Sequence, residues 1–192
     1  MRIIGGMAAG RLLKAPKGQA VRPTPDLVRQ AIFNSLAARV PGARVLDLFS
    51  GTGAIGLECL SRGAACVVSV ERSSRHAEII RENRRATGLP GDNHEVRVQD
   101  VFVALNQLRL EGRQFDLIVA DPPFGPKNVG RRSESLSQAL LDHAGLPELL
   151  APGGLLVLGH ARRDAVTVPS AWTEVKALRH GDSVMLILRR TG

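Results

Sequence analysis

Short apolar runs alternate with amphipathic segments along most of the chain. Helical spacing of apolar residues predicts helices at Pro25–Arg39, Ala54–Arg62, Ser73–Thr87, Val101–Leu110 and within Ser133–Leu150. The apolar runs predict seven strands, at Arg44–Phe49, Cys66–Glu71, Glu95–Gln99, Phe115–Ala120, Leu155–His160, Glu174–Arg179 and Ser183–Leu188. This alternation is typical of βαβ units, so we expect an α/β fold in which helices cover both faces of a mostly parallel sheet.

The two ends of the chain add detail to this picture. His180-Gly181-Asp182 separates the last two strands as a hairpin-type turn, so the final strand should run antiparallel. Residues Met1–Lys17 predict a short hairpin in which Arg2–Ile4 pairs with Gly10–Lys14. No linker or low-complexity tract interrupts the 192 residues, which predicts one domain: a basic N-terminal extension over 1–24, then a helix and the core over 25–192.

Composition narrows the cellular setting. No apolar stretch approaches the roughly 18 residues of a membrane span, and residues 1–10 lack the apolar segment of a secretory signal. We therefore expect a cytoplasmic protein with no membrane partner. The two cysteines, Cys59 and Cys66, should stay reduced there, and the five histidines stand singly, so the sequence predicts neither a disulfide nor a metal site.

Positive charge is concentrated near the N-terminus. The formal net charge is +8, and the first 30 residues hold six basic side chains against one acidic side chain. A cationic region attracts polyanions such as nucleic acids, although a solvated basic surface would look the same in the sequence. Tyrosine is absent and aromatic residues make up 3% of the chain, which disfavours an RNA-recognition motif that stacks bases on several rings.

A glycine-rich turn follows the first predicted strand. The run Val45-Leu46-Asp47-Leu48-Phe49-Ser50-Gly51-Thr52-Gly53-Ala54-Ile55-Gly56 reads as strand, turn and helix, an arrangement that binds nucleotide-like ligands. Glu71 ends the next strand, where a carboxylate can accept hydrogen bonds from ribose hydroxyls. The same spacing fits a nicotinamide dinucleotide, which therefore stays an alternative.

Asp47 favours a different cofactor. A carboxylate inside the strand before the turn suits a cationic amine and repels phosphates, which points to S-adenosylmethionine with its ammonium and sulfonium groups. Alternatively, Asp47 only caps the adjacent turn. Asp100, after the third strand, is placed to accept from an adenine amino group or to serve as the N-cap of the helix that begins at Val101.

The most informative tetrapeptide is Asp121-Pro122-Pro123-Phe124, directly after a strand. The prolines fix the backbone and lack N–H donors, so carbonyl oxygens and the Asp121 carboxylate are left as acceptors for an NH₂ group. Phe124 supplies a flat face on which a flipped base can stack. A turn that merely closes the strand is the structural alternative.

The order DLFSGTG, Glu71, Asp100 and DPPF resembles class I S-adenosylmethionine-dependent methyltransferases that methylate amines. Several further segments, RIIGG, GR, RPTPDLVR, IFN and GLECLSRGA, are similar to the RsmD family of bacterial small-subunit ribosomal RNA guanine-N2 methyltransferases. The resemblance implies a Rossmann-like class I fold and a substrate that is small-subunit ribosomal RNA or the assembling subunit.

The same resemblance implies a role for each matched position. It implies that the cofactor is held by Asp47, Phe49, Gly51, Thr52, Gly53, Glu71, Arg72, Asp100 and Val101, and the target guanine by Asp121, Pro122 and Phe124. It implies that RNA is contacted by Arg2, Arg11, Lys14, Arg22, Thr24 and Arg29. We expect a monomer that needs no metal.

Three other functions remain open at this level. An adenine-N6 methyltransferase acting on DNA or RNA would use the same acceptors, although the chain has no spare segment of target-recognition size. A nicotinamide-dependent reductase would fit the glycine turn but would need a catalytic constellation for which no tyrosine is available. A non-catalytic ribosomal RNA-binding module would explain the basic end but not the ordered acidic residues.

Overall fold

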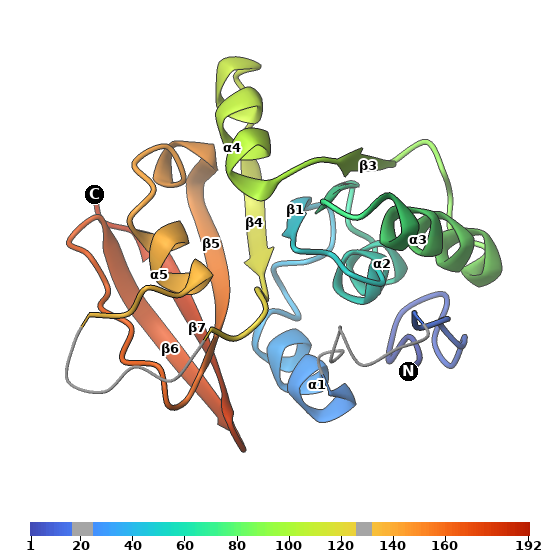
Figure 1. The fold of residues 1–192 in the computed structure, drawn as a ribbon. Helices are drawn as coiled ribbons and strands as arrows, with labels where there is room; N and C mark the ends of the chain where they lie inside the picture. The colour runs from blue at the N-terminus through green and yellow to red at the C-terminus, as the bar shows by residue number, and fades with distance from the viewer. Residues whose placement is uncertain (17–24, 126–131) are drawn as a thin grey trace.

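A seven-stranded sheet forms the centre of the protein. The computed structural model describes residues 1–16, 25–125 and 132–192. The strands lie in the order β3-β2-β1-β4-β5-β7-β6 (Figure 1). Their bounds are β1 Arg44–Leu48, β2 Cys66–Glu71, β3 His94–Val98, β4 Phe115–Ala120, β5 Leu150–Ala161, β6 Trp172–His180 and β7 Ser183–Arg190.

The strand directions confirm the predicted topology. Strands β1 to β5 are all parallel, and β7 pairs antiparallel with both β5 and β6. The chain builds the sheet outward in two opposite directions from the boundary between β1 and β4: β2 and β3 lie on one side of it, and β5 lies on the other. In open α/β sheets, ligands bind outside the carboxyl ends of the strands at such a point.

Helices cover both faces of this sheet. Their bounds are α1 Asp26–Ser35, α2 Ala54–Ser61, α3 Ser74–Thr87, α4 Val101–Leu110 and α5 Leu136–Leu141, with a 3₁₀ turn at Pro147–Leu149. Alternate strand residues point to opposite faces, so Val45 and Leu117 pack with α1 and α2, while Leu46 and Ile118 pack with α4 and α5. Asp47 shares the face of Val45 and therefore lies on the α2 side.

Local sequence signals fix several helix ends. The Ser73 side chain accepts a hydrogen bond from the backbone N–H of His76 at the start of α3, and Gly88 ends that helix with a positive φ of 71°. Asp100 caps α4 in the same way, accepting from the N–H groups of Phe102 and Val103. The alternative in which Asp100 is an N-cap is therefore confirmed.

Two predictions for the N-terminal third were too generous. Helix α1 runs from Asp26 to Ser35 and ends four residues before the predicted Arg39, because residues 36–39 form a turn instead of continuing the helix. The predicted hairpin is present but short: an antiparallel bridge joins Arg2 to Leu12, and the backbone N–H groups of Ile3 and Leu13 donate to the carbonyls of Arg11 and Met1. Lys17, Arg22 and Thr24 lie outside the described residues.

The N-terminal segment docks on α2. The Glu58 carboxylate, which is fully buried, accepts hydrogen bonds from the backbone N–H groups of Ile4 (2.7 Å) and Gly5 (2.8 Å). The Ser61 hydroxyl donates to the Gly5 carbonyl and accepts from the N–H of Ala8. These contacts hold the N-terminal hairpin beside α2 (Figure 1).

Within the described parts of the chain, no helix is both long and apolar enough to cross a membrane.

Candidate cofactor and substrate site

The glycine turn between β1 and α2 has a tightly wound backbone. Phe49, Gly51 and Gly53 all have positive φ, at 57°, 56° and 76°. The Gly53 N–H donates to the Ser50 carbonyl at 2.7 Å, which closes the turn. A side chain on Gly53 would press against Ile80 of α3, so glycine is required here both by backbone conformation and by packing. The turn therefore brings backbone atoms to the edge of the sheet, with Thr52 buried behind them.

Asp47 is a buried carboxylate at the base of this turn. The side chain is 2% exposed, and one of its oxygens accepts a hydrogen bond from the Gly56 N–H at 3.2 Å. Burial raises the pKa of Asp47 to about 7, and the negative charges of Glu71 and Asp121 add to the rise, against the lowering effect of hydrogen bonds from Ser50 and Gly56. Asp47 lies near the end of β1, Glu71 ends β2 and Asp121 follows β4, so all three carboxylates lie at the carboxyl edge of neighbouring parallel strands.

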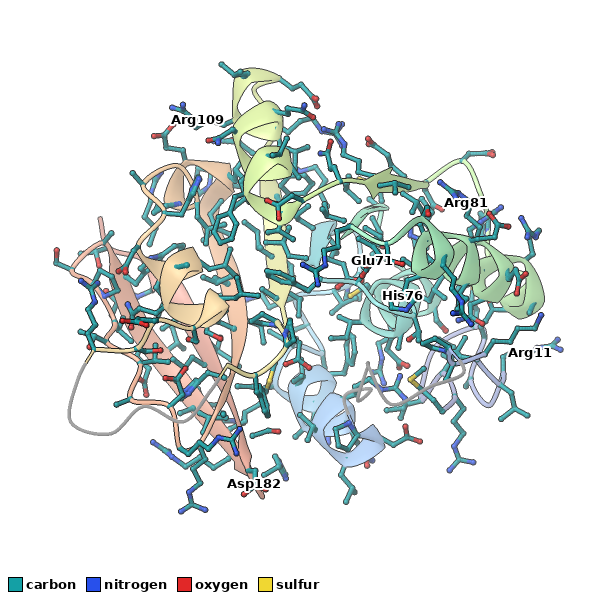
Figure 2. The ribbon with its side chains drawn as sticks, viewed as in Figure 1. Arg11, Glu71, His76, Arg81, Arg109 and Asp182 are labelled. Atoms are coloured by element: carbon teal, nitrogen blue, oxygen red, sulfur yellow. The ribbon has the colours of Figure 1, made fainter. Side chains whose placement is uncertain are left out.

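Glu71 ends β2 and braces the turn. Its Oε2 accepts from the Gly51 N–H at 2.9 Å, and its Oε1 accepts from the Ser73 N–H at 2.8 Å. The His76 Nδ1 lies 3.7 Å from Oε1, and Figure 2 shows the two side chains next to each other. Each carboxylate oxygen can accept more than one hydrogen bond, so Glu71 can still receive ribose hydroxyls.

These residues fit S-adenosylmethionine better than a dinucleotide. A buried carboxylate whose pKa is raised by its surroundings gains from a cation, and Asp47 stands beside a turn with no basic side chain. A pyrophosphate in the same place would meet the charges of Asp47, Glu71 and Asp121. The predicted cofactor residues Phe49, Gly51 and Gly53 form the turn itself, whereas Arg72 is exposed just beyond Glu71.

Asp100 and Val101 lie at the end of the neighbouring strand. Asp100 is exposed, and its Oδ1 accepts from Phe102 and Val103, while Val101 is buried at 3% exposure. Both capping hydrogen bonds use the same carboxylate oxygen. The adenine role of Asp100 stays a prediction that is compatible with its role as a cap.

The Asp121-Pro122-Pro123-Phe124 segment continues from β4 at the same edge. Asp121 is half-buried, Pro122 is buried and the Phe124 ring is 41% exposed. Gly159 of β5 lies against Asp121: a Cβ added to Gly159 would overlap the Asp121 carboxylate. The segment therefore offers a carboxylate in a fitted position and an accessible aromatic face, which can hold a planar amine.

The side chains predicted to contact RNA are partly exposed and partly buried in the structure. Arg2, Arg11 and Lys14 are exposed on the N-terminal segment, as an RNA contact requires. Arg29 is not: its side chain is 0% exposed, and its Nη2 donates to the Arg2 carbonyl and to Asp26, both at 2.7 Å. The prediction that Arg29 contacts RNA is therefore wrong, because this side chain joins α1 to the N-terminal segment. Lys14 also forms an ion pair with Glu82 at 3.0 Å.

Three important positions were missed by the sequence reasoning. Gly159 accommodates Asp121, Glu58 anchors the N-terminal segment, and Asn83 of α3 joins that segment to the glycine turn. The Asn83 amide donates to the carbonyls of Thr52 and Lys14, and its oxygen accepts from the Lys14 N–H. Glu58 lies in the GLECLSRGA segment, but no periodicity distinguishes a buried carboxylate from an exposed one.

Among the residues that the structure describes, no group of three or more His, Cys, Asp or Glu side chains is placed to hold a metal ion.

Comparisons with known proteins agree with this geometry. A family model described as conserved hypothetical protein 95 matches residues 1–189. Ribosomal RNA small subunit methyltransferase D of Escherichia coli is 34% identical over 90% of this chain and 81% of its own, and that of Haemophilus influenzae is 30% identical over 92% and 86%. The solved structure of a hypothetical protein from Thermus thermophilus superposes with a TM-score of 0.78 at 31% identity, covering 98% of this chain and 99% of that one. The chain belongs to the conserved hypothetical protein 95 family, which is the RsmD family that its motifs resemble.

Proposed function

We propose that this protein transfers the methyl group of S-adenosylmethionine to the exocyclic N2 amine of a guanine in small-subunit ribosomal RNA. The observation that carries the proposal is the meeting of Asp47, Glu71 and the Asp121-Pro122 segment at one edge of the sheet, in a chain of the RsmD family. The relatives in Escherichia coli and Haemophilus influenzae are named for methylation of small-subunit ribosomal RNA.

The cofactor side of the reaction uses the glycine turn. When bound, S-adenosylmethionine supplies a methyl group attached to positively charged sulfur. Asp47 would hold the ammonium group, because the cation relieves the cost of its burial. Glu71 would accept the ribose hydroxyls while its existing bonds to Gly51 and Ser73 keep the turn in shape.

The substrate side uses the segment after β4. The lone pair of a guanine amine is delocalised into the ring, so the amine is a poor nucleophile. Hydrogen bonds from its two N–H groups to the Asp121 carboxylate and the Pro122 carbonyl would favour pyramidal nitrogen and aim its lone pair at the methyl carbon. The nitrogen would then form a bond to that carbon as the carbon–sulfur bond breaks, would lose one proton during or after the transfer, and the neutral thioether S-adenosylhomocysteine would be the leaving group. Phe124 would stack on the flipped base, an interaction that contributes roughly 1–3 kcal/mol in other proteins.

The binding surface and setting complete the proposal. Arg2, Arg11 and Lys14, which are exposed on the N-terminal segment, would contact phosphates of the RNA. We propose a monomer that acts in the cytoplasm on the assembling small subunit or its RNA, without a metal.

The test maps the methylated atom directly. Small ribosomal subunits that lack the modification are incubated with isotopically labelled S-adenosylmethionine, and the labelled nucleotide is identified by mass spectrometry after nuclease digestion. The proposal predicts one labelled guanine, methylated at N2, and none with the Asp121→Ala variant. Label on adenine N6 would favour the alternative methyltransferase, and tight binding of NADH without S-adenosylmethionine binding would favour the reductase.

A further inference from the structure

A strongly basic cleft lies away from the candidate site. It has a volume of about 650 Å³ and is formed by the end of α1, the turn that follows it, the start of β5, the middle of β6 and the end of β7. The start of β5 is at the amino end of the parallel strands, whereas Asp121 follows the carboxyl end of β4. In Figure 1 the arrowhead of β4 points toward one end of the sheet, and the C-terminus lies toward the other end.

Every charged side chain in the lining of this cleft is positive. Arg39, Lys176 and Arg189 contribute positive side chains to the walls, and none of the described residues that line it is Asp or Glu. Arg190 also lines the cleft, but it pairs with Trp172 and its side chain points to the opposite face of the sheet. None of these four side chains forms an ion pair with a carboxylate anywhere in 1–16, 25–125 or 132–192. By contrast, Arg97 on β3 is paired with both Glu95 and Glu111.

Two of these cations, Arg39 and Lys176, are held in place by neutral groups. Arg39 Nη1 donates to the Gly153 carbonyl at 3.3 Å, and Lys176 Nζ donates to the Ser35 hydroxyl at 3.1 Å. An irregularity in the pairing of β6 with β7 between Glu174 and Lys176 brings both Val175 and Lys176 to the cleft. The cleft thus orders positive charge without neutralising it, which is the property expected of an anion-binding surface.

We propose that this cleft binds the phosphodiester backbone of the RNA substrate, as a contact separate from the N-terminal segment. The choice of RNA as the occupant rests on the proposed function. Arginine matches phosphate oxygens with paired donors, and each phosphate that is neutralised releases condensed counterions. The contact adds affinity and fixes orientation at a distance from the methylated base, and it does not read the sequence of the RNA.

The test compares two pairs of substitutions that remove the same charge. Arg39→Gln with Arg189→Gln alters the cleft, while Arg109→Gln with Arg113→Gln alters two arginines that are paired with Glu148 and Glu95. Arg109 lies in the last turn of α4 and is labelled in Figure 2. Binding of each variant to an in vitro transcript of small-subunit ribosomal RNA is measured from low to high salt, together with S-adenosylmethionine affinity.

We expect the cleft variant to lower the slope of log K against log salt by about 1.4–1.8, or 0.7–0.9 for each of two phosphate contacts. The control pair should leave the slope unchanged, and both pairs should bind the cofactor as the wild type does. Ultraviolet crosslinking of the wild type should attach RNA to the peptide that carries Arg189, and the KM for small subunits should rise in the cleft variant at constant kcat.

Two results would overturn the inference. One is equal slopes for the cleft variant and the control pair. The other is weaker binding of the cleft variant to whole subunits with unchanged binding to the free transcript, because the partner would then be a protein. Failure of the proposed function is a separate result, since it would appear as a wild type that methylates no RNA, whichever way the cleft variant binds.

Discussion

The candidate site and the basic cleft carry opposite charge within one small domain. At the carboxyl ends of the strands, Asp47, Glu71 and Asp121 are close enough for the last two to raise the pKa of the first. In the cleft, Arg39 and Lys176 are ordered by neutral partners with no carboxylate in the lining. The net charge of +8 therefore conceals an acidic edge suited to amines and a separate surface suited to phosphates.

The largest effect is expected at Asp121. Its replacement by alanine removes the carboxylate acceptor, and loss of one preorganised group of this kind typically costs about 10²–10³ in kcat. Binding of S-adenosylmethionine, measured by calorimetry, should stay within a few fold of the wild type. Asp121→Asn, which keeps the size of the side chain, is the matched control for packing. Equal loss of cofactor binding and methyl transfer would show that Asp121 belongs to the cofactor site.

A smaller but still large effect is expected at Gly159. In Gly159→Ala the new methyl group would overlap the Asp121 carboxylate, which must then move. Displacement of a reacting group by about 1 Å can cost roughly 10²-fold in rate. Single-turnover kinetics should show this loss with little change in cofactor affinity. A variant as active as the wild type would mean that the fitted position of Asp121 does not matter.

Asp47 should make cofactor binding depend on pH. The ammonium pairs with the ionised carboxylate, so the affinity for S-adenosylmethionine should fall as pH drops below about 7, by up to tenfold per pH unit. Asp47→Asn should bind more weakly at pH 8 and lose this dependence. A titration in buffers of different ionisation enthalpy measures the linked proton, and a pH-independent wild type would contradict the assignment.

The same residue should affect the stability of the ligand-free protein. The folded-state pKa of Asp47, about 7, lies above the unfolded value, so the free energy of unfolding contributed by this group falls as pH rises from about 4 to 7. Asp47→Asn should therefore raise Tm by a few degrees at pH 8 and by less near pH 4, as measured by calorimetry. A lower Tm at both pH values would indicate that the carboxylate is stabilising.

The smallest effect is expected for the exposed N-terminal cations. Replacing Arg2, Arg11 and Lys14 by glutamine should reduce the salt slope of RNA binding by about 0.7–0.9 for each phosphate contact that is lost. Lys14 should contribute least, because it already pairs with Glu82. An unchanged slope in filter-binding measurements would mean that these side chains form only a solvated surface.

Local patterns were sufficient for most of the architecture. The seven strands, the antiparallel last strand and the helices on both faces follow from apolar periodicity and from turn residues such as Gly88 and His180-Gly181-Asp182, whereas the strand order was not predicted. The residues of the glycine turn and of the Asp121-Pro122 segment were also identified, because their chemistry is concentrated within a few consecutive positions. Their roles in binding remain predictions for the experiments above to test.

The sequence by itself determined which elements form and which short segments carry acceptors, since these properties depend on neighbours along the chain. Only the tertiary structure decided the fate of Arg29, which burial turned from a predicted RNA contact into a link within the fold. It also placed Gly159 against Asp121 and gathered the cleft from α1, β5, β6 and β7. Packing decides which charges remain accessible, and packing joins residues that no local pattern connects.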